Sequence, residues 1–173
     1  MSKPAARTST SNVKAKTSNI PEANPSDVAS IDAIITAAYD VISGPAGKKR
    51  DWNRERSLFL SGARLIPTAV EAGRNDVDLA PQLLDVEGYI ARVESLVEKK
   101  GFYEEEIAQR VEQFGRIAHV WSTYESRHDL SDPEPFMRGI NSMQLFNDGK
   151  RWWIVSIYWQ HESERHPLPE KYL

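Results

Sequence analysis

Apolar residues recur along this chain with two different periods, and the change of period divides it into a helical half and a strand half. Between residues 28 and 42 the apolar positions fall at helical spacing, which predicts a first helix that begins near Ser26 or Asp27. A short second helix is expected at about residues 52–58. Asp85 is a typical N-cap for a third, in which Val86, Ile90, Val93 and Val97 share one face.

The second half is rich in β-branched and aromatic residues, and glycines fall where the chain has to reverse. This pattern predicts four long strands at about residues 102–113, 116–128, 136–146 and 151–162. A further strand is expected at residues 60–70, before the third helix. Pro67 places that strand at an edge or a bulge, because proline cannot donate to the hydrogen-bond ladder.

These elements predict an α+β fold in which three N-terminal helices pack on a strongly curved, mixed or antiparallel β-sheet that ends in an antiparallel meander. The folded domain is expected to span residues 26–165. Residues 1–25 are rich in Ser, Thr, Lys, Asn and Pro without apolar periodicity, so we expect a disordered tail. Residues 166–173 contain two prolines and are expected to be irregular.

Composition and charge narrow the classes of protein to consider. Apolar residues make up 40% of the chain and charged residues 27%, and no apolar run approaches the roughly 20 residues of a membrane helix. The net charge of −3 argues against a nucleic-acid binder, which needs a concentrated basic face. The chain has no cysteine, which excludes disulfides and thiolate chemistry. We therefore expect a cytoplasmic protein that binds neither membranes nor nucleic acids.

The turn at Phe114-Gly115 sorts the side chains of the first hairpin into two groups. One side carries Val111, Gln109, Ile107 and Glu105 with Ala118, Val120, Ser122 and Tyr124. The other side is dense in charge, and burying several unpaired ions would cost kilocalories each. We therefore expect Glu105, Ser122 and Tyr124 to point inward, toward the helices.

Asp148-Gly149 predicts a tight turn for the last hairpin and sorts its side chains in the same way. The side expected to face inward holds Asn141, Met143, Leu145, Trp152, Ile154, Ser156, Tyr158 and Gln160. The outer side is too apolar to leave in water, and such patches usually mark an interface. We therefore predict a homodimer through the outer sheet face, at Trp121, Trp153, Ile157 and Trp159. A slip of one residue in either hairpin would exchange the two sides.

Several stretches together resemble the nuclear transport factor 2-like superfamily over roughly residues 28–162, and most closely its uncharacterised bacterial members. They are Trp52 with Leu58-Phe59, Gly62–Ile66, Gly115–Tyr124, Asn141–Leu145 and Asp148–Ser156. The superfamily includes ketosteroid isomerase-like and SnoaL-like proteins. The resemblance implies a cystatin-like cone, in which helices cross a concave sheet and leave an apolar pocket at the wide end.

The same resemblance suggests which residues to consider as catalytic groups. Isomerases of this superfamily use an Asp base on an early strand, but Ser61–Ile66 has no carboxylate, so that base is not carried over. Glu105 is the one carboxylate expected inside, opposite Tyr124, and the two could act as general base and hydrogen-bond donor. Alternatively, Glu105 lies at a solvated strand end. The expected pocket lining is Trp52, Phe59, Ser122, Asn141, Met143, Trp152, Ser156, Tyr158 and Gln160.

Two functions follow from these features. The first is a pocket protein for a small apolar or aromatic carbonyl compound, acting as a cofactor-free isomerase, dehydratase or cyclase. The second is a non-enzymatic homodimeric binding module that uses the outer sheet face. No metal is expected, because strand alternation separates His161 from Glu162 in the one His- and Glu-rich segment, and no cofactor motif is present.

Overall fold

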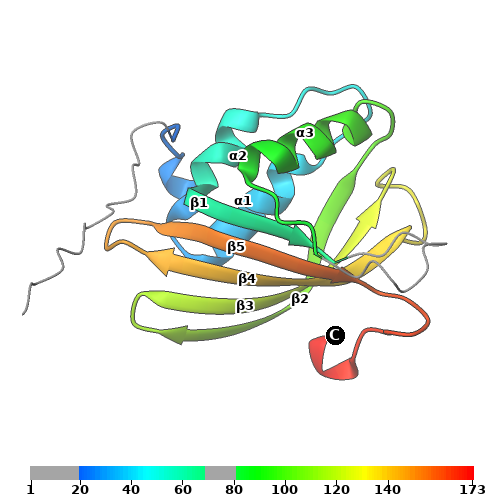
Figure 1. Ribbon diagram of the computed structural model, residues 1–173. Coiled ribbons are helices and arrows are strands. Elements are labelled where there is room, and N and C mark those ends of the chain that lie inside the picture. The colour runs from blue at the N-terminus through cyan, green and yellow to red at the C-terminus, as the bar shows by residue number, and fades with distance from the viewer. Residues whose placement is uncertain (1–19, 69–80) are drawn as a thin grey trace, which may run out of the picture.

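The computed structural model describes residues 20–68 and 81–173, which form a helical layer on one side of a sheet (Figure 1). The helices are η1 (Pro25–Val28), α1 (Ile31–Ile42), α2 (Trp52–Leu58), α3 (Val86–Val97) and η2 (Glu170–Tyr172). The strands are β1 (Phe59–Pro67), β2 (Tyr103–Phe114), β3 (Ile117–Arg127), β4 (Met137–Asn147) and β5 (Trp152–His161). The predicted α+β class, with three helices on a curved sheet, is confirmed.

Side-chain caps fix where the longer helices begin. Ser30 Oγ accepts a hydrogen bond from the amide of Ala33 at 3.1 Å, and Asp85 Oδ1 accepts from Gly88 at 2.8 Å. Each cap satisfies an amide that the first turn of a helix leaves without a partner. Within residues 20–68 and 81–173, no helix is long and apolar enough to cross a membrane. Residues 1–19 of the tail expected to be disordered lie outside the described residues.

The sheet has five strands in the order β1-β5-β4-β3-β2. Strands β2 to β5 form the antiparallel meander, and β1 adds to β5 in parallel, so the sheet is mixed. β1 is an edge strand, which is where a proline such as Pro67 is tolerated. The core lies between the concave face and the helices, with Ile34 and Ile35 of α1 packed in the same buried cluster as Val120 and Met143.

Strands β2 and β5 each contain a β-bulge, and these two irregularities change the facing of side chains. In β2, Glu106 pairs with Tyr124 but Ala108 pairs with Thr123, so Ile107 is an extra residue. In β5, Val155 is the extra residue, because Leu145 pairs with Ile154 and Gln144 pairs with Ser156. An extra residue reverses the alternation of the strand beyond it.

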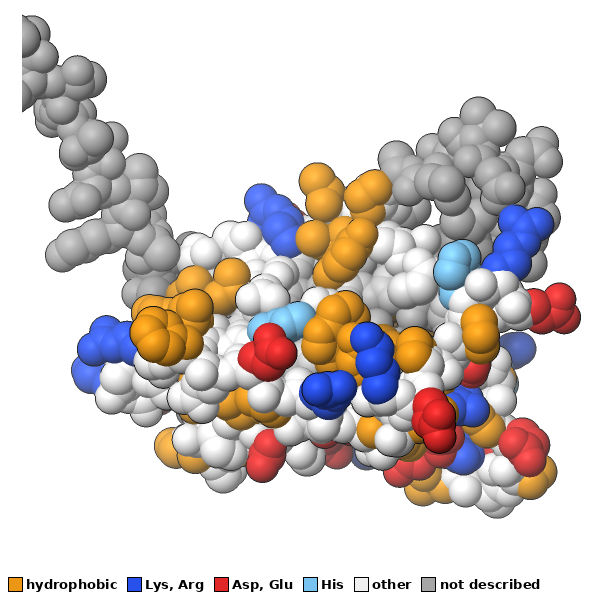
Figure 2. Space-filling view, turned by 90° about the horizontal axis from the view of Figure 1, so that it is seen from below, with side chains coloured by type: hydrophobic (Ala, Val, Ile, Leu, Met, Phe, Trp, Pro, Cys, Tyr) orange, Lys and Arg blue, Asp and Glu red, His pale blue; other side chains and the backbone are white. Residues whose placement is uncertain are grey.

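The outer face of the sheet is partly covered by the end of the chain. The ring of Tyr172 in η2 stacks on Trp121 with centroids 5.3 Å apart, and its carbonyl accepts a hydrogen bond from Thr123 Oγ1 at 2.6 Å. Seen from the side of η2, exposed hydrophobic side chains form separate groups with charged residues between them (Figure 2). The segment expected to be irregular thus includes a short helix that packs on the sheet.

The prediction of a dimer surface needs correction at two of its four residues. Ile157 and Trp159 lie beyond the bulge of β5, so they pair inward with Met143 and Asn141 instead of pointing outward. Trp153 does face outward, but it is only 8% exposed, with the guanidinium of Arg151 3.6 Å from its ring centroid. The outer face therefore lacks the continuous tryptophan patch that motivated the dimer, and the homodimer itself stays a prediction.

We expect Tyr172→Ala to lower the free energy of unfolding by about 1–2 kcal/mol, because it removes the aromatic stack on Trp121. Chemical denaturation measures this difference. Tyr158→Ala is the matched control: Tyr158 is 46% exposed on the same face and should cost less. Equal losses in the two variants would show that the end of the chain does not stabilise the outer face.

Candidate functional site

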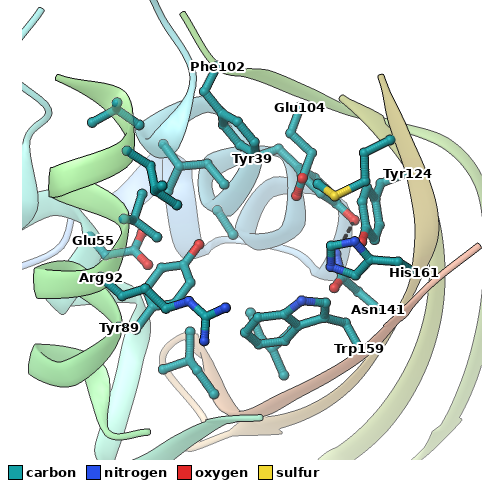
Figure 3. Close-up of a pocket in the computed structure, with 18 of the residues that line it drawn as sticks. Tyr39, Glu55, Tyr89, Arg92, Phe102, Glu104, Tyr124, Asn141, Trp159 and His161 are labelled. Atoms are coloured by element: carbon teal, nitrogen blue, oxygen red, sulfur yellow. Dashed lines mark hydrogen bonds between the residues drawn. The ribbon is translucent and has the colours of Figure 1, made fainter. Parts of the chain in front are cut away.

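A cavity of about 160 Å³ lies between the helices and the concave face of the sheet (Figure 3). Its wall is mainly apolar, and a few polar groups converge on it from helices α1, α2 and α3 and from strands β2 to β5. The polar and aromatic side chains include Tyr39, Glu55, Tyr89, Arg92, Phe102, Glu104, Tyr124, Asn141, Trp159 and His161. A concave apolar site with a small number of polar groups is the usual form of a small-molecule site.

The carboxyl of Glu104 enters this cavity because of the bulge at Ile107. Beyond the bulge, Glu104 shares the inner side with Tyr124 and Ser126. Ser126 Oγ donates a hydrogen bond to Glu104 Oε2 at 2.8 Å. Burial nevertheless raises the pKa of Glu104 to about 7. Both protonation states are therefore populated at neutral pH, as a general acid or base requires.

A chain of hydrogen bonds beside Glu104 fixes where the hydroxyl protons point. Asn141 Nδ2 donates to Tyr39 Oη at 2.9 Å, and Tyr39 Oη lies 2.6 Å from Ser122 Oγ. Ser122 donates its single proton to the carboxylate of Glu106, so the proton between the two hydroxyls belongs to Tyr39. Burial raises the pKa of Tyr39, which keeps this proton in place. Tyr39 therefore organises the cavity wall and has no proton left for a ligand.

Tyr124, in contrast, has a hydroxyl without a hydrogen-bond partner among the described residues. Its side chain is 1% exposed to solvent. Gly139 on the neighbouring strand makes room for it, because a Cβ at that position would lie 2.6 Å from Tyr124 Oη. Burial raises the pKa of Tyr124, so the phenol stays protonated. It is a hydrogen-bond donor held ready for an oxygen atom in the cavity.

His161 lies beside Tyr124, with ring centroids 6.5 Å apart and the rings perpendicular. Burial lowers the pKa of His161, and the positive charge of Arg92 lowers it further. The ring is therefore neutral at pH 7 and can accept one hydrogen bond while it donates another. Arg92 is exposed, and its guanidinium donates to Gln82 Oε1 at 2.5 Å.

Glu55 of α2 is a second carboxyl on the cavity wall, and it is 2% exposed. Within the described residues, its Oε2 has no hydrogen-bond partner. Burial raises the pKa of Glu55 to about 8, and the charge of Arg54 offsets this only in part. Glu55 is therefore a neutral acid at pH 7.

The expectation that Glu105 points into the pocket is wrong. Its side chain is 67% exposed, and its carboxylate accepts a hydrogen bond from Arg127 at 3.0 Å. The hairpin turn is at Gly115-Arg116. Near this turn the side chains of β2 point to the predicted faces of the sheet, but beyond the bulge at Ile107 they point to the opposite faces. The acids of β2 that share the inner side with Tyr124 are therefore Glu104 and Glu106, on either side of Glu105.

The last strand shows the same reversal. Its turn spans Asp148 to Arg151, so the side chains before the bulge face as predicted, but those beyond it do not. Ser156, Tyr158 and Gln160, expected on the pocket wall, belong to the outer side. The residues that face inward in their place are Ile157, Trp159 and His161.

The structure places the other expected pocket residues in two groups. Tyr124, Asn141 and Met143 lie on the cavity wall. The other group is buried but does not line the cavity, and it comprises Trp52, Phe59, Ser122 and Trp152. Trp52 Nε1 donates a hydrogen bond to Glu94 at 3.0 Å.

Sequence reasoning missed most of the polar groups of the cavity. For Glu55 a signal exists, because it lies three residues after Trp52 and three before Leu58, on the buried face of a short helix. An acid at such a position requires an explanation. For Glu104 and His161 the strands give no comparable signal, because both depend on bulges. Among the described residues, no three His, Asp or Glu side chains gather into a metal-ligating group.

Comparisons with known proteins identify only the fold. No protein-family model and no curated protein matches the sequence. An NTF2-like protein of unknown function from Shewanella baltica is 16% identical, with a TM-score of 0.52 over 78% of this chain and 92% of that one. A protein with a cystatin-like fold from Nostoc punctiforme is 10% identical (TM-score 0.56, 78% and 90% covered). LinA is 11% identical (TM-score 0.54, 82% and 89% covered). Identities this low indicate a common fold and carry no activity across.

The raised pKa of Glu55 predicts how stability depends on pH. Between its ordinary value of 4.5 and about 8, the folded state holds a proton that the unfolded state has lost, so the free energy of unfolding falls as pH rises. Glu55→Gln removes this contribution, and we expect it to gain stability relative to the wild type from pH 5 to pH 8. Denaturant unfolding at both pH values measures the change. Glu105→Gln should show no such gain, and a Glu55→Gln difference independent of pH would contradict the prediction.

Proposed function

We propose that this chain, which has the nuclear transport factor 2-like fold, binds a small, mainly apolar ring compound with a carbonyl group and moves a proton at the carbon beside that carbonyl. The observation that carries the proposal is that a desolvated acid, Glu104, shares the cavity with Tyr124, whose hydroxyl has no hydrogen-bond partner among the described residues. An engineered apolar cavity of about 150 Å³ holds a benzene molecule, so a cavity of about 160 Å³ suits a single ring.

The proton transfer divides between these two residues. The carboxylate of Glu104 takes the proton from the carbon, and the electron pair moves to the carbonyl oxygen as an enolate forms. Tyr124 donates a hydrogen bond to this oxygen, whose negative charge grows during the step. Protonated Glu104 can then return the proton to another carbon, or deliver it to a leaving hydroxyl. Isomerisation and dehydration thus share one first step, and Glu104 takes the role first assigned to Glu105.

The alternative, a non-enzymatic module that binds through the outer sheet face, has less support. Two of its four proposed contact residues, Ile157 and Trp159, belong to the cavity. A third, Trp121, is stacked against Tyr172 of the same chain. If the cavity bound its ligand without catalysis, the class of ligand would be the same. The protons on the carbons of the ligand would then not exchange.

The test is deuterium exchange at the carbons beside the carbonyl in a panel of small cyclic ketones, followed by NMR. We expect the wild-type protein to accelerate exchange of at least one ketone. Glu104→Gln should lower that rate by about a hundredfold or more, because a positioned general base contributes at least that much. Glu105→Gln, one residue away but exposed, should leave the rate unchanged.

Two results would contradict the proposal. The first is exchange that survives Glu104→Gln at the wild-type rate. The second is a wild-type protein that accelerates exchange of none of the ketones it binds, which would leave a binding pocket without catalysis.

A further inference from the structure

The carboxyl of Glu55 is the group of the cavity that the proposed proton transfer leaves unused. It comes from α2, whereas Glu104 comes from β2, and the two carboxyls lie on opposite sides of the cavity space (Figure 3). Glu55 is 2% exposed, and its Oε2 has no partner among the residues that the structure describes. A buried carboxyl oxygen without a partner is costly, so the Glu55 carboxyl, which lies on the cavity wall, indicates a partner that the ligand brings.

The surroundings of this carboxyl favour a cation. Aromatic residues surround the space between the two acids: Tyr39, Tyr89, Phe102, Tyr124 and Trp159. The faces of aromatic rings attract ammonium groups, most strongly when the site is desolvated, and a carboxylate adds a charged hydrogen-bond acceptor. Tyr89 is close enough to Glu55 for the carboxylate charge to raise the pKa of its phenol. A cation at Glu55 would therefore lie within electrostatic reach of Tyr89.

We propose that the ligand of this cavity carries a protonated amine, and that the amine binds against Glu55. The proposal rests on the proposed function, because it adds a second functional group to the ring compound that Glu104 and Tyr124 would act on. It makes the natural ligand a small cyclic amine or ring-bearing amine whose carbonyl lies at the opposite end from the nitrogen.

The charged and titratable groups that bear on Glu55 are those of the cavity wall, together with Arg54. They are Arg54 of α2, Tyr39 of α1, Tyr89 and Arg92 of α3, Glu104 of β2, Tyr124 of β3 and His161 of β5. Arg54 is engaged with Asp27 and Asp40. Arg92 is on the same cavity wall, but it is exposed, it donates a hydrogen bond to Gln82, and its charge acts on His161.

Amine binding at this position has a consequence for protons. Before an amine binds, Glu55 is protonated at pH 7, because burial raises its pKa to about 8. An ammonium group favours the carboxylate, so binding should expel the proton from Glu55 to solvent. Affinity for the amine should therefore rise as pH increases from about 6 to about 8.

Benzylamine and benzyl alcohol form a matched pair of probes, since they share a ring and differ in charge. Isothermal titration calorimetry at pH 7 should show benzylamine binding at least about tenfold more tightly, as expected for a hydrogen-bonded charge pair. The buffer dependence of the binding enthalpy should report close to one proton released for benzylamine and none for benzyl alcohol. Glu55→Gln should reduce benzylamine to the affinity of the alcohol, while Glu105→Gln should keep the preference.

The outcomes separate this inference from the proposed function. Equal affinity for the two probes, or amine binding without proton release, would overturn the amine site and leave the ketone exchange reaction standing. Exchange that fails while the amine preference holds would overturn the reaction and leave the amine site. Both readouts on the wild-type protein are independent of whether Glu55→Gln folds.

Discussion

One extra residue in β2 and one in β5 decide which side chains enter the cavity. Adjacent residues of a strand point to opposite faces, so each bulge reverses the facing of every residue beyond it. The bulge at Ile107 brings Glu104 inside and leaves Glu105 in water. The bulge at Val155 turns Trp159 and His161 inward. Without these two bulges the same strands would present neither the acid nor the histidine to the helices.

Desolvation then determines the chemistry of the residues inside. It raises the pKa of Glu104 to about 7 and that of Glu55 to about 8, and it keeps the phenol of Tyr124 protonated. Buried acids held in this way lower stability near neutral pH. Proteins tolerate such a cost mainly where the groups have a function. The two acids differ in their contacts, since Ser126 bonds to Glu104 whereas Oε2 of Glu55 has no partner in the described structure.

The outer face of the sheet illustrates the same dependence on tertiary contacts. Trp121 and Trp153 are the tryptophans that face outward, and each is covered by its own chain. Tyr172 stacks on the first, and Arg151 lies over the second. The apolar residues that suggested an interface in the sequence are thus largely covered by contacts within one molecule. The concave face, where Trp159 lines a cavity, is therefore the side of the sheet on which we expect a ligand to bind.

The sequence alone determined the order of helices and strands, most of their limits to within a few residues, and a sheet under a helical layer, although the expected first helix is divided into η1 and α1. These follow from apolar periodicity, caps and turn residues, which are local signals. It also placed Tyr124 and Asn141 toward the helices, because their strands, β3 and β4, pair with each other without a bulge. Which carboxyl joins them was decided only in the tertiary structure. A bulge arises from the fit of a strand to its neighbours and to the curvature of the sheet. The residues around Ile107 include no glycine that would indicate a bulge in the sequence.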